Sequence, residues 1–280
     1  TLELTRKNNM AQQRPEILTK ILAHKQTEIA EKQQRVPLEQ MQEWAKDGDA
    51  KRPFEAMLRA AKSAAKPGVI AEIKRASPSK GILREDFDPM AIARSYQMGG
   101  ATCLSVLTDN EFFKGGGPVL ELARKACSLP ALRKDFIIDP YQVYESRVLG
   151  ADCLLLIVSA LDEAQLNDLY ALAKQQNLDV LIEVHDEHEM DRALALKPTM
   201  VGVNNRNLRS FEVDLETSLR LHAKVPAECL LVTESGIHTT QDIETMQAQD
   251  INTFLVGEAF MRAPDPGQKL KELFFPNRPY

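Results

Sequence analysis

From Val69 onward the chain alternates between short apolar runs and longer amphipathic segments, and this alternation restricts the fold more than any other feature. The segments between the runs, such as DPMAIARSYQMGGA, carry apolar residues at helical spacing. Strict alternation of this kind predicts parallel strands joined by right-handed helical crossovers. Each run has the length of a buried strand. The eight runs are VIAEIK, TCLSVLT, PALRKDF, DCLLLIV, DVLIEVH, TMVGVNN, CLLVTESG and TFLVGEA.

Eight such units favour a closed barrel over an open sheet. A chain of 280 residues is long enough, because α/β barrels of roughly 250 residues are commonly single domains. The first strand is not followed by the G-x-G-x-x-G turn of a dinucleotide-binding sheet. We therefore predict an α/β fold, a (β/α)₈ TIM barrel over residues 67–280, with helices that end at Gly99 to Gly100 and at Gly150.

Residues 1–66 have helical character only and form a predicted N-terminal extension. In RPEILTKILAHKQTEIAEKQQ, Ile17, Ile21 and Leu22 share one apolar stripe, and two further short helices begin near prolines. No Gly- or Ser-rich linker divides these helices from Val69. We expect the extension to pack against the barrel, so that the two parts make a single structural domain.

Composition narrows the functional classes. Lys plus Arg total 35 against 40 Asp plus Glu, a net charge of −5, which argues against a nucleic-acid partner. The four cysteines are far apart and form no C-x-x-C pair, which is typical of reduced thiols. The stretch TLELTRKNNM lacks the apolar core of a signal peptide, and no apolar run approaches about 18 residues. We expect a cytoplasmic protein without a membrane partner.

Polar residues gather at the carboxyl ends of four predicted strands. Catalytic residues of a (β/α)₈ barrel come from these ends and from the loops that follow. Partial solvation and a local ion pair would explain any one of them, but four such ends at one mouth are costly unless they face a charged ligand. The residues are Glu72 and Lys74, Lys134 and Asp135, Glu183 and His185, and Asn204 and Arg206.

The last two strands are followed by small residues and by segments that can start a helix. In barrels of this type, the corresponding loops often hold a phosphate with backbone N–H groups and a short helix. Two tight turns that need glycine are the alternative for either motif alone. Together they favour a phosphate site formed by Ser235, Gly236, Gly257 and Glu258.

The predicted ligand is a phosphorylated small molecule with a second anionic group, because three further cations, Lys74, Lys134 and Arg206, face the mouth. The carboxylates Glu72 and Glu183 beside them suit general acid and base chemistry. No cysteine or serine stands beside an obvious base, so covalent catalysis has little support apart from a lysine Schiff base. The segment HDEHE could bind a metal, but a solvated acidic helix start explains it better. No cofactor is expected.

The ordered motifs resemble those of the indole-3-glycerol phosphate synthase family over the whole barrel, and the first helix resembles that family's extra helices. One departure is Gly116, where the family usually has serine. The motifs are AEIKRASPSKG, SVLTDNEFFKGG, LRKDFIIDPYQVYESRVLGAD, LIEVHDEHE, GVNNRNLRSFEVD, ESGIH and FLVGEAFMR. The resemblance implies that 1-(o-carboxyphenylamino)-1-deoxyribulose 5-phosphate is converted to indole-3-glycerol phosphate with loss of carbon dioxide and water. The reaction that the resemblance implies is a step of tryptophan biosynthesis.

The resemblance also implies catalytic roles. Lys134 is implied as the general acid on the ketone oxygen, and Lys74 as the cation that holds the substrate carboxylate and as a second acid. Glu183 and Glu72 are implied to stabilise positive charge on the anilino nitrogen and to act as bases in the dehydration. Asn204 is implied to position the intermediate.

Binding roles follow from the same resemblance. Ser77 is implied to close over the substrate from the first loop, and aromatic and aliphatic side chains to form walls against its ring. The implied substrate-binding residues are Ser77, Phe112, Phe136, Leu155, Arg206, Glu234 and Ser235. The implied phosphate-binding residues are Ser235, Gly236, Gly257 and Glu258. Because some family members are fused to phosphoribosylanthranilate isomerase and this chain ends just after the eighth helix, we expect the synthase step alone.

Two alternatives remain. Another phosphate-binding barrel, such as an isomerase of aminosugar phosphates, would differ in its residues on the first and fifth strands, where this chain has Glu72 and Glu183. A non-catalytic barrel would keep the phosphate loops and lose Lys134 or Glu183, and both are present. We expect a monomer or a weak homodimer.

Overall fold

The computed structural model describes residues 14–276, in which eight parallel strands close into a barrel. The strands follow one another around the barrel in chain order, and β10 pairs with β1 to close it. The predicted (β/α)₈ barrel is thus confirmed. The strands are β1 (Gly68–Ile73), β4 (Cys103–Leu107), β5 (Ala131–Lys134), β6 (Cys153–Ile157), β7 (Asp179–Val184), β8 (Met200–Asn204), β9 (Leu230–Glu234) and β10 (Thr253–Val256).

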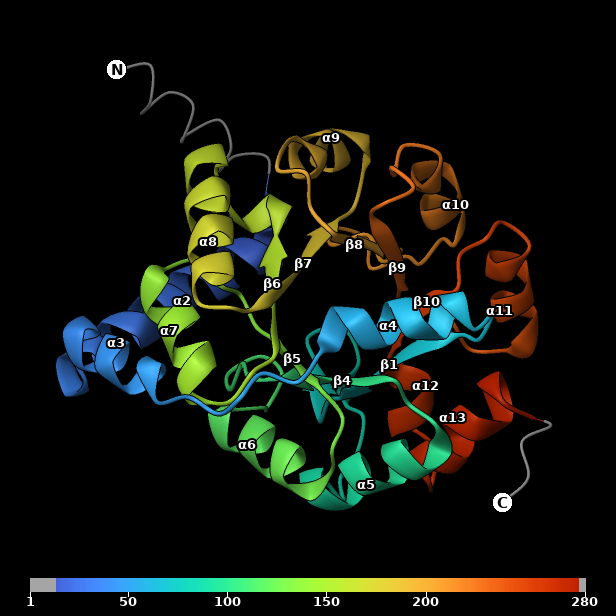
Figure 1. Ribbon diagram of the computed structural model, residues 1–280, viewed down its shortest axis with the longest axis horizontal. Helices are drawn as coiled ribbons and strands as arrows, with labels where there is room; N and C mark the ends of the chain where they lie inside the picture. Colours follow the sequence, from blue (N-terminus) through green and yellow to red (C-terminus); the bar gives the residue numbers. More distant parts are fainter. Residues whose placement is uncertain (1–13, 277–280) are drawn as a thin grey trace.

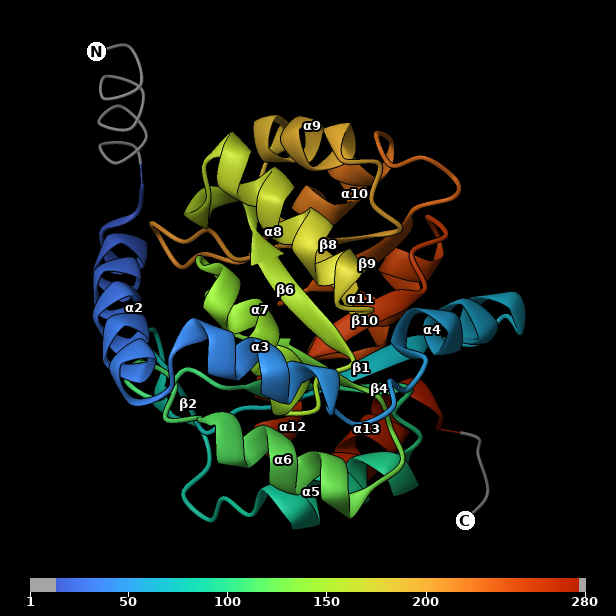
Figure 2. The same ribbon diagram turned by 60° about the vertical axis from the view of Figure 1, so that its left-hand side comes forward.

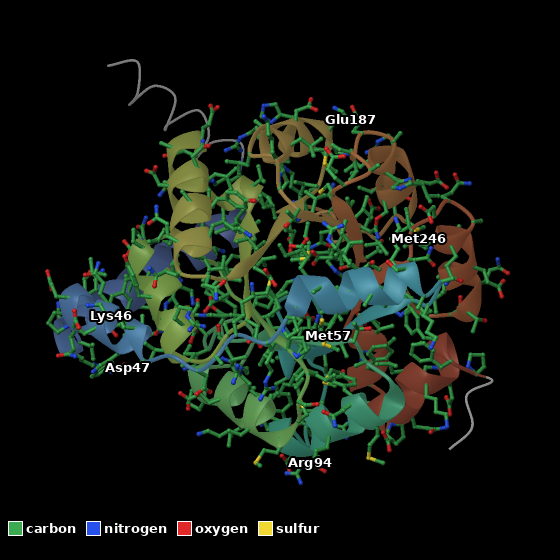
Figure 3. The ribbon with its side chains drawn as sticks, viewed as in Figure 1. Lys46, Asp47, Met57, Arg94, Glu187 and Met246 are labelled. Atoms are coloured by element: carbon green, nitrogen blue, oxygen red, sulfur yellow. The ribbon has the colours of Figure 1, made fainter. Side chains whose placement is uncertain are left out.

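Helices between the strands form a ring outside the barrel (Figure 1). Arg94 on the outer side of this ring is exposed, whereas Met246 is buried (Figure 3). The burial of one face of each helix against the strands supplies the core between the two layers. The helices are α5 (Pro89–Gly99), α6 (Gly117–Ala126), α7 (Pro140–Val148), α8 (Glu163–Gln175), α9 (Glu187–Ala195), α10 (Glu216–His222), α11 (Thr240–Gln247) and α13 (Pro266–Phe274).

Helix ends agree with the sequence signals. Gly100 and Gly150 have φ angles of 101° and 80°, the left-handed conformation that glycine adopts without strain after a helix. At the other ends, aspartate side chains accept hydrogen bonds from first-turn N–H groups. These N-caps include Asp88, Asp139, Asp162, Asp186 and Asp265.

Short elements in the loops were not predicted from the sequence. The loop after β1 contains a hairpin of β2 (Ala76–Ser77) and β3 (Gly81–Ile82), and a 3₁₀ turn, Val158–Ala160, follows β6. The one-turn helix α12 (Glu258–Met261) after β10 agrees with the predicted helix start there. No helix in residues 14–276 combines the length and the apolar character needed to cross a bilayer.

Residues 14–66 contain the helices α2 (Glu16–Arg35), α3 (Leu38–Lys46) and α4 (Phe54–Ser63). α4 covers the end of the barrel where the strands begin, because Arg59 donates to the carbonyl oxygens of Thr199 and Glu228, which precede β8 and β9. α2 lies on the opposite side (Figure 2). The predicted apolar stripe of α2 is buried at Ile21 and Leu22.

A buried lysine ties α2 to the carboxyl ends of β4 and β5. The Lys25 Nζ lies 3.1 Å from an oxygen of Asp109, 3.0 Å from one of Asp135 and 2.7 Å from one of Glu28. Lys25 has no exposed surface. Burial alone would lower the pKa of Lys25, but the three carboxylates outweigh burial and raise it. The ammonium therefore stays charged and balances carboxylates from three segments.

Replacing Lys25 by methionine should destabilise the protein by about 3–5 kcal/mol, because carboxylates would be left buried without their cation. Urea unfolding followed by circular dichroism measures this loss. Lys20→Met is the matched control on the same helix: Lys20 is 63% exposed and pairs only with Glu16 in the described residues, so its removal should cost about 0.5 kcal/mol or less. Equal unfolding midpoints for the two variants would contradict the assigned role of Lys25.

Candidate active site

A cavity opens at the carboxyl ends of the strands, and all eight strands contribute side chains to its lining. Because side chains alternate along a strand, residues two apart enter the barrel together. Fourteen of the fifteen residues predicted for the site line this cavity. They are Glu72, Lys74, Ser77, Lys134, Phe136, Leu155, Glu183, Asn204, Arg206, Glu234, Ser235, Gly236, Gly257 and Glu258.

The centre of the site is the ammonium group of Lys134. Its Nζ lies 2.5 Å from Glu234 Oε2, 3.4 Å from Glu183 Oε2 and 3.9 Å from Glu72 Oε2. Lys74 pairs with the other oxygen of Glu72 at 2.7 Å. The predicted convergence of charges from separate strands at one mouth is therefore observed.

The charges of this cluster stabilise one another. Burial alone would lower the pKa of Lys134, but the carboxylates of Glu234, Glu183 and Glu72 raise it above its ordinary value. Burial would raise the pKa of Glu72, but the ammonium groups of Lys74 and Lys134 hold it below its ordinary value. Lys134 is therefore protonated and can donate, while Glu72 is ionised and can accept.

Glu234 differs from the other two carboxylates. Burial and the neighbouring Glu183 outweigh the attraction of Lys134 and raise the pKa of Glu234 to about 7. Its Oε1 atom is buried and has no hydrogen-bond partner in the structure. A carboxyl group that titrates near neutral pH beside Lys134 can exchange a proton with it. From the sequence, Glu234 was expected only to bind substrate.

Two glycines leave the space that these carboxylates occupy. A Cβ added at Gly202 on β8 would lie 2.2 Å from Glu234 Oε1, and one added at Gly257 would lie 2.6 Å from Glu72 Oε1. Neither contact is possible without a shift. Gly257 thus has a structural role in the site besides the phosphate-binding role expected from the sequence.

Asn204 connects the charged cluster around Lys134 to the loop after β9. Its Nδ2 donates to Glu183 Oε1 at 3.1 Å, and its Oδ1 accepts from Ser235 Oγ at 3.0 Å and from the Arg206 backbone N–H at 3.0 Å. The Arg206 guanidinium pairs with Glu258 at 3.3 Å. Five of the predicted residues, counting Asn204 and Arg206 themselves, are therefore linked by direct hydrogen bonds or ion pairs.

The turn after β9 has an unusual backbone. Ser235 and Gly236 have φ angles of 64° and 92°, so two consecutive residues adopt the left-handed conformation. A non-glycine residue held in this region stores strain, which is common where backbone groups approach a ligand. The short helix α12 begins at Glu258 on the neighbouring strand's loop. The turn that is expected to bind phosphate therefore has a backbone conformation that a tight turn needing only glycine does not explain.

Apolar residues form the other walls of the cavity, among them Phe136, Leu155 and Phe113. Phe112, predicted as a wall of the site, lies elsewhere in this structure. Phe112 is outside the cavity lining and packs edge-on against His24 of α2, at 5.7 Å between ring centroids. Asp109 Oδ1 accepts from the N–H groups of both phenylalanines, and in this tight turn the two neighbouring rings diverge.

Helix α2 also lines the cavity, through Ile17, Leu18 and Ile21. The apolar stripe of this helix is visible in the sequence, but its role in the site is not, because the surface that it faces is formed by segments far away in the chain. For the HDEHE segment, no group of three or more His, Cys, Asp or Glu arranged to hold a metal occurs in residues 14–276.

Gly202→Ala should lower kcat by about 10²-fold, because the added methyl group displaces Glu234 from Lys134 without removing any polar atom of the site. Steady-state kinetics measure the effect. Gly68→Ala is the control at the other end of the barrel, where the nearest atom to the added Cβ, on Leu58, lies at 3.3 Å, and it should keep its activity. An unchanged kcat in Gly202→Ala would show that the position of Glu234 is unimportant.

Comparisons with solved structures agree with the barrel fold, and comparisons of sequence identify a family. Tryptophan synthase subunit alpha from Legionella pneumophila str. Paris aligns with a TM-score of 0.59 at 13% identity, covering 80% of this chain and 97% of that chain. N-acetylmannosamine-6-phosphate 2-epimerase from Clostridium perfringens aligns with a TM-score of 0.60 at 14% identity, covering 77% and 95%. At such low identity these two structures show the shared fold alone.

Sequence similarity is far higher to one group. A protein of Polaromonas naphthalenivorans (strain CJ2) named indole-3-glycerol phosphate synthase is 58% identical over 259 residues, which are 92% of this chain and 98% of that protein. The family model described as indole-3-glycerol phosphate synthase matches residues 18–273. The chain therefore belongs to the indole-3-glycerol phosphate synthase family.

Proposed function

We propose that this chain converts 1-(o-carboxyphenylamino)-1-deoxyribulose 5-phosphate to indole-3-glycerol phosphate, carbon dioxide and water. The observation that supports this most directly is the Lys134 ammonium group, which is buried among three carboxylates at the mouth of the barrel. It is a proton donor with possible proton acceptors within 4 Å.

Binding places the two anionic groups of the substrate at different parts of the cavity. The phosphate binds to the loops after β9 and β10, at Ser235, Gly236, Gly257 and Glu258. The carboxylate binds to Lys74, and Arg206 and Ser77 close on the sugar and the phosphate. The aromatic ring packs against Phe136 and Leu155, and also against Phe113, which replaces Phe112 in this role.

Ring closure forms the new carbon–carbon bond. The ring carbon that carries the carboxylate attacks the ketone carbon, and Lys134 protonates the ketone oxygen as it becomes a hydroxyl group. Positive charge develops on the ring and the anilino nitrogen, where the carboxylates of Glu183 and Glu72 stabilise it. Loss of carbon dioxide returns an electron pair to the ring and restores its aromatic character.

Dehydration completes the indole. A lysine, Lys74 or Lys134, protonates the new hydroxyl group, which leaves as water, and a carboxylate, Glu183 or Glu72, accepts the proton lost from carbon. One proton is consumed overall, because the ionised carboxylate group leaves as neutral carbon dioxide. Glu234 lies 2.5 Å from Lys134, and with a pKa of about 7 it can return that proton to the lysine between turnovers.

The surroundings of the site support further proposals about the whole chain. We propose that the extension, residues 1–66, and the barrel, residues 67–280, act as one structural domain, because α2 both lines the cavity and places Lys25 among the loop carboxylates. The cysteines of the described residues are free thiols, which supports a cytoplasmic location.

The test is a fluorescence assay for indole-3-glycerol phosphate formed from the carboxyphenylamino substrate. Lys134→Ala should lose about 10²- to 10⁴-fold in kcat, because a positioned general acid acts on the barrier. Lys46→Ala is the control on the surface helix α3, where the side chain is 67% exposed, and it should match the wild type (Figure 3). Absence of product with the wild type would refute the function, and a fully active Lys134→Ala would refute only the role of Lys134.

A further inference from the structure

His185 lies directly after β7, two residues beyond Glu183, and its imidazole ring lies between two carboxylates. Its Nε2 is 3.3 Å from Glu183 Oε1, and its Nδ1 is 2.9 Å from Glu189 Oε2. The same Glu189 oxygen accepts the backbone N–H of His185 at 2.9 Å. Only 12% of the side chain is exposed, and His185 is not among the residues that line the cavity. The ring is therefore held behind Glu183, out of reach of a substrate.

The two neighbours determine the charge of the ring. Ionised carboxylates only accept hydrogen bonds, whereas a neutral imidazole has one donor nitrogen and one acceptor nitrogen. Both contacts can be favourable only if both nitrogens carry hydrogen, which is the imidazolium form. Burial alone would lower the pKa of His185, but Glu183 and Glu189 raise it to about 10. His185 is thus a cation at neutral pH.

This cation changes the balance of charges in the site. Glu72 is paired with Lys74 at 2.7 Å, and Glu234 is paired with Lys134 at 2.5 Å. Glu183 is farther from Lys134: its Oε2 lies 3.4 Å from the Lys134 Nζ. Its other oxygen, Oε1, lies 3.3 Å from the His185 Nε2. With His185 included, four carboxylates face three cations, because Glu189 also pairs with His185. Without it, Glu183 and Glu234 would both depend on Lys134.

We propose that His185, oriented by Glu189, is a positioning residue that keeps Glu183 ionised and correctly placed, so that Lys134 remains available to the substrate. The proposal rests on the function proposed above, because it concerns the base and the acid of that reaction. The polar groups that face the pair from other elements are Lys134 on β5, Glu234 on β9 and Asn204 on β8. Lys134 lies against the other oxygen of Glu183, Glu234 is a carboxyl group, and Asn204 is uncharged, so none of them supplies a positive charge at Glu183 Oε1.

The decisive variant is His185→Gln, which has nearly the same size and retains a hydrogen-bond donor but carries no charge. Its kcat should fall by about 10- to 100-fold, because Glu183 loses the cation that lies 3.3 Å from its Oε1, while KM changes little because His185 does not line the cavity. The acidic limb of the kcat profile should move to higher pH, since a carboxylate without its cation binds a proton more readily. A merely structural role would not move this limb.

A matched control lies three residues further along the chain. His188, in the first turn of α9, is exposed, and His188→Gln should keep the kcat and the pH profile of the wild type. Glu189→Gln should change both quantities in the same direction as His185→Gln but less, because the ring then keeps one carboxylate. Its own control is Glu187→Gln, at the outer edge of α9 (Figure 3).

The charge of the ring can be observed directly. Nitrogen-15 NMR spectra of histidine-labelled protein at pH 8, with the signal assigned by its absence in His185→Gln, should show both ring nitrogens protonated. A neutral ring at pH 8 would overturn the proposal, as would an unshifted acidic limb in His185→Gln. If His185→Gln fails to fold, an unchanged kcat and pH profile in Glu189→Gln would overturn it instead. In each of these cases wild-type turnover would leave the proposed function intact.

Discussion

The pairing of Lys134 with three buried carboxylates is the interaction around which the rest of the structure is arranged. The four side chains come from β5, β1, β7 and β9, which are alternate strands in the order around the barrel. Alternate strands of a (β/α)₈ barrel send their side chains into a common layer, which is normally filled with branched apolar residues. Here the uppermost such layer is ionic. Closure of the barrel leaves its members no other position, so barrel geometry itself brings them within ion-pair distance.

An ionic layer in a buried position has to be balanced, and the surrounding residues do this in two ways. Charge is balanced from the flanking positions, by Lys74 two residues after Glu72 and by His185 two residues after Glu183. Space is provided by two glycines, Gly202 on β8 and Gly257 directly after β10, which lie against the carboxylates of Glu234 and Glu72. The balance is incomplete at Glu234, whose pKa of about 7 leaves one proton free to move in the neutral range.

Much of this arrangement follows from the sequence, because its causes are local or periodic. The eight strands are recognisable from apolar runs of regular length, and polar residues at strand ends have only one place to meet in a parallel barrel. Glu72, Lys134 and Glu183 could be assigned for this reason. Glu234 could be named from its motif, but its raised pKa could not be predicted, since that depends on burial and on distances between strands far apart in the chain.

The remaining differences arise where the outcome depends on tertiary contacts. Phe113 lines the cavity and Phe112 does not, a difference that the sequence could not show, because two adjacent phenylalanines in a tight turn are equivalent there and only the packing of His24 against Phe112 distinguishes them. The hairpin after β1 has two residues per strand, too few for a periodic signal. Lys25 looks like an ordinary exposed residue of an amphipathic helix until Asp109 and Asp135 are placed beside it.

The Lys25 cluster explains how a helix outside the barrel can affect the chemistry inside it. Asp135 follows Lys134 directly, and it accepts from Thr108 and Arg133 as well as pairing with Lys25. Asp109 in turn holds the loop that presents Phe113 to the cavity. The backbone on both sides of Lys134 is therefore fixed by buried charges, and a lysine side chain with four rotatable bonds gains a defined position for its ammonium group. Helix α2 thus acts on the site through its charge as well as through the apolar wall that it contributes.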